Sequence, residues 1–190
     1  IYGASKMFAE YLTVNANARG FPAGTRLACV RYGNVMGSRG SVVQTWRADV
    51  RACRPLRLTD ARMTRFWLTL DDACGLVEHA LTCMQGGEVF VPKLRAIRLT
   101  DLAAAIAGDD YPLTSIGLRP GGEKLHEALL GVHEVARTFD YGDVYAVPPE
   151  LHEWTGTTWI GTPFPHARYE SDSVEFIGVE ELRRMVQQVT

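Results

Sequence analysis

The spacing of hydrophobic residues divides the chain into alternating helical and extended segments. Apolar residues at intervals of three and four run through 2–19 and end at Gly20, which predicts an amphipathic helix with a glycine stop. The same periodicity predicts further helices, the first of them capped by Ser41, at 42–53, 70–84, 101–107 and 179–189. Mostly apolar runs of strand length lie at 26–32, 56–58, 64–68 and 88–92. Because short buried strands alternate with helices, we expect an α/β fold built on a parallel sheet.

The pattern changes from about Leu113 onward. A strand-like run at 113–117 leads into a charged loop that contains glycine. The elements expected after this loop are a short helix that ends at Leu130 and extended pieces at 135–140 and 143–147. Residues 148–168 are rich in Pro, Gly and Thr, which predicts an irregular surface segment.

Composition narrows the classes of protein that fit this pattern. Of the 190 residues, 46% are hydrophobic and 22% are charged, which fits one compact soluble protein with a sizeable core. The 20 basic and 22 acidic residues give a net charge of −2, so no basic field is available to hold nucleic acid. Apolar runs are shorter than the roughly 18–20 residues that span a bilayer, and we expect no secretory leader. We therefore expect neither nucleic acid nor a membrane as a partner.

The cysteines and histidines point to no metal or disulfide chemistry. The four cysteines form no CxxC pair, and we expect buried reduced thiols, which favour a cytoplasmic location. The five histidines show no metal-ligand spacing, so no metal is expected.

Tyr2 and Lys6 form a candidate catalytic pair at the start of the first helix. Residues four apart project from the same side of a helix. A phenol titrates near 10, and an ammonium group held close to it favours the phenolate and lowers the phenol pKa. The pair can therefore act as a general base with its electrostatic partner. Tyr-x-x-x-Lys also arises often by chance on helices, so a purely structural role stays open.

Two loops have residues suited to phosphate binding. Residues 33–41 follow a buried strand and precede a helix, where α/β sheets bind ligands, although the glycine spacing is not that of the dinucleotide fingerprint and a simple tight turn is the alternative. Arg39, Arg62 and Arg65 offer planar donors for phosphate, with solvated surface arginines as the alternative. The loop 119–124 combines an arginine, glycines and a carboxylate, which suits the diphosphate and ribose of a sugar nucleotide or, alternatively, a plain charged loop.

Taken in order, several segments resemble one family. The motifs are Tyr2-Gly3-Ala4-Ser5-Lys6, Arg31-Tyr32-Gly33-Asn34-Val35, Gly37-Ser38-Arg39-Gly40-Ser41-Val42, Thr59-Asp60-Ala61-Arg62-Met63-Thr64-Arg65-Phe66-Trp67, Gly86-Gly87-Glu88-Val89-Phe90-Val91-Pro92-Lys93 and Glu123-Lys124-Leu125-His126-Glu127. Their order and spacing resemble the soluble, inverting UDP-N-acetylglucosamine 4,6-dehydratases, which are extended short-chain dehydrogenases/reductases of bacterial surface-glycan and pseudaminic acid biosynthesis. The resemblance covers nearly the whole chain and is best from Ile1 to Glu127.

The resemblance implies a fold and an assembly. The fold is the C-terminal part of a Rossmann-like doubly wound parallel sheet with a small C-terminal substrate-binding subdomain. Residues 1–112 would belong to the NADP-binding domain, with substrate-domain segments interleaved, and residues 113–190 mainly to the substrate-binding subdomain. The family also implies a homo-oligomer.

The resemblance further implies a reaction and the residues that perform it. Tyr2, assisted by Lys6, would take the proton of the sugar C4 hydroxyl while NADP⁺ accepts the hydride, and Lys6 would also bond the nicotinamide ribose. The 4-ketone then acidifies the C5 proton and allows water to leave C6, after which hydride returns to C6 and C5 is inverted. Val35 would lie near the nicotinamide. The residues implied in binding the UDP-sugar are Asn34, Val42, Val43, Trp46, Arg65, Arg119 and Glu123.

The chain also departs from the family pattern. The family's glycine-rich nucleotide loop and elimination residues, which precede the position of Tyr2, are absent, so we expect a fragment that by itself is inactive and retains no NADP. The pair Gly121-Gly122 has one glycine more than the family's loop, and 148–168 has no counterpart. A sugar-nucleotide epimerase, a 5,6-dehydratase or a non-catalytic sugar-nucleotide-binding module stays open as an alternative.

Overall fold

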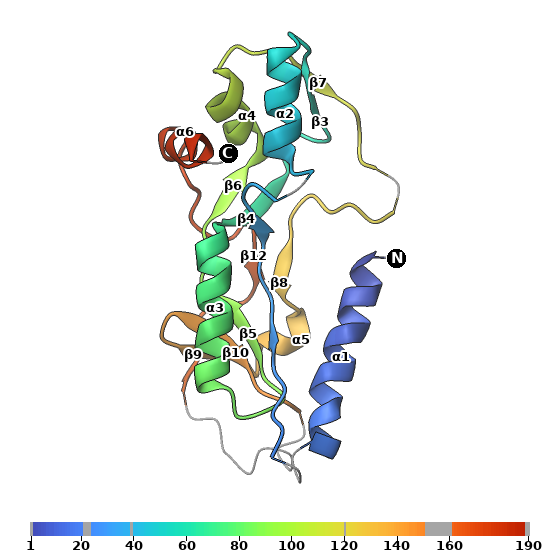
Figure 1. The fold of residues 1–190 in the computed structure, drawn as a ribbon, viewed down its shortest axis with the longest axis vertical. Coiled ribbons are helices and arrows are strands. Elements are labelled where there is room, and N and C mark those ends of the chain that lie inside the picture. The colour runs from blue at the N-terminus through green and yellow to red at the C-terminus, as the bar shows by residue number, and fades with distance from the viewer. Residues whose placement is uncertain (1, 21–23, 39, 120, 151–160, 189–190) are drawn as a thin grey trace. The chain divides into compact units, whose positions relative to one another are not determined.

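In a computed structural model of the chain, the described residues are 2–20, 24–38, 40–119, 121–150 and 161–188 (Figure 1). The chain forms two compact units from interleaved segments. Unit 1 consists of Ile1–Tyr32, Asp71–Lys93 and Leu129–Tyr169, and unit 2 of Gly33–Leu70, Leu94–Ala128 and Glu170–Thr190.

Unit 1 is built on a sheet of mixed direction. Its helices and strands are α1 (Tyr2–Gly20), β1 (Cys29–Val30), α3 (Leu70–Cys83), β5 (Val89–Pro92), α5 (Val132–Val135), β9 (Phe139–Tyr141), β10 (Val144–Val147) and β11 (Thr162–Pro163). The strand order is β1-β5-β10-β9-β11, with β1 and β5 parallel and the remaining pairs antiparallel. Helix α3 lies along this sheet and packs Leu76 and Ala80 against Phe90 and Ala146 (Figure 1).

Unit 2 carries smaller sheets covered by helices. Its elements are β2 (Asn34–Val35), α2 (Val42–Arg51), β3 (Leu56–Leu58), β4 (Thr64–Leu68), β6 (Ala96–Arg98), α4 (Leu99–Ala107), β7 (Leu113–Ser115) and α6 (Val179–Gln187). Strand β4 pairs in parallel with β2 and antiparallel with β6, and β3 pairs in parallel with β7. The buried residues of its core are Val43, Trp46, Leu56, Leu58, Trp67, Ile97, Leu102, Ala103, Ala105, Ile177, Leu182 and Val186. Two further strands, β8 (Ala128–Leu130) and β12 (Tyr169–Glu170), pair with each other.

The α/β class is confirmed, and the parallel pairs β1–β5 and β3–β7 join segments that were predicted as strands. The parallel pair β2–β4 was not predicted, because Asn34 and Val35 were expected in a loop. Most elements differ from the predicted ranges by only a few residues. Helix α2 ends at Arg51 because Cys53 adopts a positive φ of 51°, which a right-handed helix does not allow. Ser41 occupies the N-cap position of α2, but its hydroxyl makes no capping hydrogen bond.

Three predicted features are wrong. The helix expected to end at Leu130 is instead strand β8, and the helix comes later, where Gly131 N-caps α5 and the Glu134 carboxylate accepts the Gly131 N–H. The strand expected at 26–32 is reduced to Cys29–Val30. The four cysteines are free thiols, but Cys53 and Cys74 are exposed rather than buried. Among the described helices, none is both long and apolar enough to cross a bilayer.

Candidate functional site

Unit 2 contains a cavity of about 510 Å³. Its walls come from the loop after β2, one side of α2, strands β3 and β4, and the segment that follows β7. Seven residues predicted to bind substrate or cofactor line it: Asn34, Val35, Val42, Trp46, Arg65, Arg119 and Glu123. These residues are up to 89 positions apart in the chain (123 − 34), so the fold gathers them at one place.

Helix α2 forms one wall of the cavity through residues at helical spacing. Val42, Thr45, Trp46 and Asp49 all line the cavity, since positions i, i+3, i+4 and i+7 share one side of a helix. The Trp46 Nε1–H donates to the carbonyl oxygen of Arg57 in β3 at 3.2 Å, which fixes the indole ring. Val43 does not line the cavity. It is fully buried in the core, so the structure gives its side chain no access to a ligand there.

Arg119 and Glu123 form a closed pair at the charged part of the cavity. The Arg119 Nη2 donates to Glu123 Oε1 at 2.6 Å, and the Arg119 backbone N–H donates to Glu123 Oε2 at 2.9 Å. The Arg119 guanidinium is largely exposed while the Glu123 side chain is 11% exposed. The hydrogen bond from the Arg119 side chain lowers the pKa of Glu123 below its ordinary value. Glu123 is therefore ionised at neutral pH.

Arg65 is held more firmly. Its Nη1 donates to the carbonyl oxygens of Thr64 at 2.7 Å and Leu125 at 3.0 Å, and its side chain is 12% exposed. The Arg65 Nη2 lies 3.9 Å from Glu123 Oε1. Two guanidinium groups and one carboxylate thus meet in one cavity, which suits a ligand with both phosphate oxygens and hydroxyl groups.

The predicted catalytic pair lies in unit 1. Tyr2 and Lys6 both belong to α1, which runs without a break from Tyr2 to Gly20. The backbone of α1 therefore sets the two residues one turn apart, and Lys6 is exposed. The side chain of Tyr2 lies outside the described residues.

The other predicted phosphate-binding arginines have different outcomes. Arg39 lies outside the described residues. Arg62 does not line the cavity, and its Nη2 donates to Asp60 Oδ2 at 2.8 Å. The hydrogen bonds from Arg62 hold the pKa of Asp60 at about 2. Arg62 is exposed and paired with an aspartate of its own turn, as expected if it is a surface arginine and not a phosphate ligand.

Sequence reasoning missed several lining residues. Asp49 is nearly fully buried, and its Oδ1 accepts from Arg54 Nη2 at 2.8 Å, while its Oδ2 has no hydrogen-bond partner among the described residues. Thr45 and Asp49 follow from the helical period once Val42 is placed in the site. Trp67 and Ile116 gave no such signal, because their position depends on contacts between distant segments.

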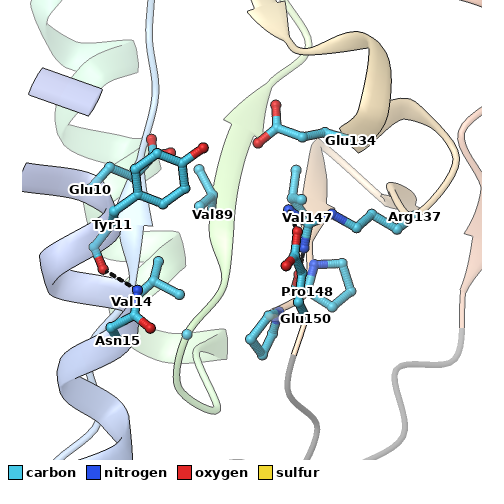
Figure 2. Close-up of a pocket in the computed structure, with 12 residues that line it drawn as sticks. Glu10, Tyr11, Val14, Asn15, Val89, Glu134, Arg137, Val147, Pro148 and Glu150 are labelled. Atoms are coloured by element: carbon cyan, nitrogen blue, oxygen red, sulfur yellow. Dashed lines mark hydrogen bonds and ion pairs between the residues drawn. The ribbon is translucent and has the colours of Figure 1, made fainter. Parts of the chain in front are cut away.

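Unit 1 contains a second, smaller cavity of about 120 Å³ (Figure 2). Figure 2 shows Glu10 and Tyr11 on one side and Glu134 and Arg137 on the other. The carboxylates of Glu10 and Glu134 are both bound by Arg31, and Arg137 donates to the carbonyl oxygen of Pro148 at 2.7 Å. No predicted site residue lines this cavity, and its charges are paired internally. The cavity of unit 2 is therefore the candidate site.

Comparison with known proteins gives the same family as the motifs. The family model described as "Polysaccharide biosynthesis protein" matches residues 1–149. The chain is 40% identical over 152 residues to a UDP-N-acetylglucosamine 4,6-dehydratase (inverting) of Campylobacter jejuni, covering 80% of this chain and 45% of that protein. It is 39% identical over 150 residues to a UDP-glucose 4-epimerase of Rickettsia felis, covering 77% and 43%. The chain spans about half the length of the curated relatives it matches.

A solved structure supports the fold over the whole chain. The X-ray structure of Pen from Bacillus thuringiensis superposes with a TM-score of 0.86 at 32% identity, covering 100% of this chain and 58% of that chain. The Rossmann-like α/β fold predicted from the motifs is confirmed by this match. With a family model covering residues 1–149 and a full-length structural match, the chain belongs to the polysaccharide biosynthesis protein family.

Proposed function

We propose that the cavity of unit 2 binds a UDP-linked N-acetylhexosamine, and that the chain belongs to an NADP-dependent, C5-inverting UDP-N-acetylglucosamine 4,6-dehydratase of bacterial surface-glycan biosynthesis. The observation that carries the proposal is the gathering of six predicted substrate residues in one cavity. We also propose that the protein is a homo-oligomer located in the cytoplasm. Among surface-glycan pathways, we propose that it serves pseudaminic acid biosynthesis.

The charges of the cavity support a nucleotide diphosphate as the ligand. Arg65 and Arg119 supply planar donors that pair with phosphate oxygens. Glu123, ionised at neutral pH, accepts hydrogen bonds from hydroxyl groups such as those of a ribose. A volume of about 510 Å³ is within the range of pockets that hold ligands of this size.

We further propose that Tyr2, Lys6 and Val35 contact the nicotinamide end of NADP, as the family resemblance implies. Tyr2 and Lys6 lie one turn apart on one continuous helix of unit 1, and Val35, in unit 2, is a half-buried apolar residue. The chemistry that NADP⁺ would supply when bound is acceptance of a hydride from the sugar C4 and its later return to C6. Tyr2 takes the proton of the C4 hydroxyl, and the Lys6 ammonium group stabilises the resulting phenolate.

A second candidate function is 4-epimerisation of a UDP-sugar. The observation that favours it is the identity of 39% to a UDP-glucose 4-epimerase, against 40% to the dehydratase. Both reactions start with the same removal of a proton by Tyr2. Incubating the complete protein with UDP-N-acetylglucosamine separates them, because only the dehydratase yields a product lighter by one water.

Calorimetric titration of the chain with UDP tests the binding proposal. We expect UDP to bind, and Arg119→Ala to weaken binding about 10- to 100-fold, since a hydrogen bond to a charged group contributes about 1.5–3 kcal/mol. Arg62→Ala is the matched control, because this exposed arginine does not line the cavity. Absence of UDP binding, or an equal loss in both variants, would contradict the proposal.

A further inference from the structure

Three side chains behind the charged part of the cavity form a continuous chain of hydrogen bonds. Thr64, in β4, is nearly fully buried, and its Oγ1 lies 2.8 Å from His126 Nδ1 and 2.7 Å from Ser171 Oγ. Ser171 is fully buried, and its Oγ accepts the backbone N–H of Glu127 at 2.9 Å. All of these residues belong to unit 2.

Every donor and acceptor in this series of hydrogen bonds is satisfied only when the hydroxyl groups donate from Ser171 towards His126. Ser171 Oγ already accepts from Glu127, so its own hydrogen is free to donate to Thr64 Oγ1. The Thr64 hydroxyl then donates to His126 Nδ1, which must be an acceptor. In the reverse direction, Ser171 would accept twice and its buried O–H would have no acceptor among the described residues, a cost of about 1–3 kcal/mol. The network therefore assigns His126 Nδ1 the role of hydrogen-bond acceptor.

The same segments hold the guanidinium of Arg65. The Thr64 backbone N–H donates to the Leu125 carbonyl oxygen at 3.0 Å. Arg65 Nη1 donates to that same oxygen and to the Thr64 carbonyl oxygen. The two carbonyl groups that fix Arg65 thus belong to Thr64 itself and to the residue before His126. The hydrogen bond between His126 and Thr64 therefore joins the same two segments that the Arg65 guanidinium bridges.

We propose that His126 is a positioning residue: its Nδ1 accepts the end of the Ser171–Thr64 hydroxyl chain and so holds Arg65 in place for the diphosphate of the ligand. This inference rests on the proposed binding of a sugar nucleotide. His126 itself touches no ligand in this scheme, because it does not line the cavity. Its contribution therefore passes through Arg65 and affects only the part of the affinity that comes from the phosphates.

The test compares His126→Ala with His126→Asn in titrations with UDP and with uridine. Asparagine places an acceptor oxygen near the position of Nδ1, whereas alanine leaves the Thr64 hydroxyl without an acceptor. We expect His126→Ala to weaken UDP binding about tenfold with uridine affinity unchanged, and His126→Asn to restore most of the UDP affinity. Arg65→Ala should abolish any further effect of His126→Ala. His133→Ala, at an exposed position in unit 1, is the matched control.

A second measurement needs no ligand. In an NMR spectrum, the Arg65 Nε–H signal should shift and exchange faster with water in His126→Ala, and should resemble the parent in His126→Asn. The inference is overturned if this signal is unchanged, if uridine and UDP lose affinity equally, or if the effects of Arg65→Ala and His126→Ala simply add. If no variant binds UDP but the Arg65 signal responds as expected, the proposed function fails while the positioning of Arg65 by His126 stands.

Discussion

Position 33 requires a glycine because two segments of the chain approach each other closely there. A Cβ built on Gly33 would lie 2.4 Å from the Phe66 Cβ and 2.7 Å from the Phe66 carbonyl oxygen. Phe66 is fully buried in β4, so it cannot move aside without disturbing the strand that carries Arg65. The glycine that precedes Asn34 is thus needed for packing and not for a left-handed backbone, since its φ is not positive.

We therefore expect Gly33→Ala to lower the free energy of unfolding by about 1–3 kcal/mol, as overpacking of a buried contact does. Gly75→Ala is the matched control, because Gly75 lies within α3 and a Cβ there meets no atom within 4 Å. That control should raise stability by about 0.5–1 kcal/mol, since glycine is a poor helix former. Urea unfolding measures the change in the free energy of unfolding for both variants. If both variants were stabilised, or both destabilised, the close contact at Gly33 would not explain the requirement for glycine.

The position of a single residue was predicted well where helical spacing alone determines it, and poorly where it depends on distant segments. Val42 and Trp46 both line the cavity of unit 2, because residues four apart share a helix face. Val43 belongs to the same stretch, but its position about 100° further around α2 turns it into the core. The role of His126 was missed, since it depends on Thr64 and Ser171. Thr64 lies 62 residues before His126 in the chain, and Ser171 lies 45 residues after it.

At the scale of elements, helices were predicted better than the strands of the C-terminal part. Helices α1, α3 and α6 follow a regular period and end close to the predicted residues. Strand β8 has no such signature: its three residues, Ala128–Leu130, are equally suited to a helix. They are extended because they pair with β12, a contact between distant segments that sequence spacing does not reveal.

The segment from β7 to β8 is closed upon itself by the bonds between Arg119 and Glu123, and this closure should depend on pH. The Arg119 side chain lowers the pKa of Glu123 below its ordinary value of 4.5. A group with a lowered pKa in the folded state stabilises the fold fully above its ordinary pKa, and this contribution is lost as the pH falls through the folded value.

Glu123→Gln removes this titration. Between about pH 6 and about pH 3, we expect the stability of the parent to fall more than that of the variant, by about 0.5 kcal/mol, since Arg119 is largely exposed. The measurement is urea unfolding at several pH values. Glu180→Gln is the control, because Glu180 pairs with Arg183 outside the cavity. An equal acid dependence in Glu123→Gln and the parent would show that the pair does not stabilise the segment.

At the scale of the whole molecule, the apolar stripe from which helix α1 was predicted stays largely exposed to solvent. Met7, Phe8, Tyr11 and Leu12 are each more than half exposed. Helix α3 shows the same feature at Val77 and Leu81. Periodicity alone therefore predicted the helix correctly, but it does not say which surface covers the apolar side.

Contiguous exposed apolar side chains bind other apolar surfaces, whereas single ones are ordinary on protein surfaces. We therefore expect the chain to bind a hydrophobic dye and to associate as its concentration rises. Phe8→Lys combined with Leu12→Glu should reduce both effects, because it places charges within the stripe on α1. Val132→Lys should change neither, since Val132 is 82% exposed but belongs to the short helix α5 and is not part of the stripe on α1. Dye fluorescence and light scattering measure the two effects. If the α1 double variant behaved like Val132→Lys, the stripe would be an ordinary surface, and the family's implied homo-oligomer would have to form elsewhere.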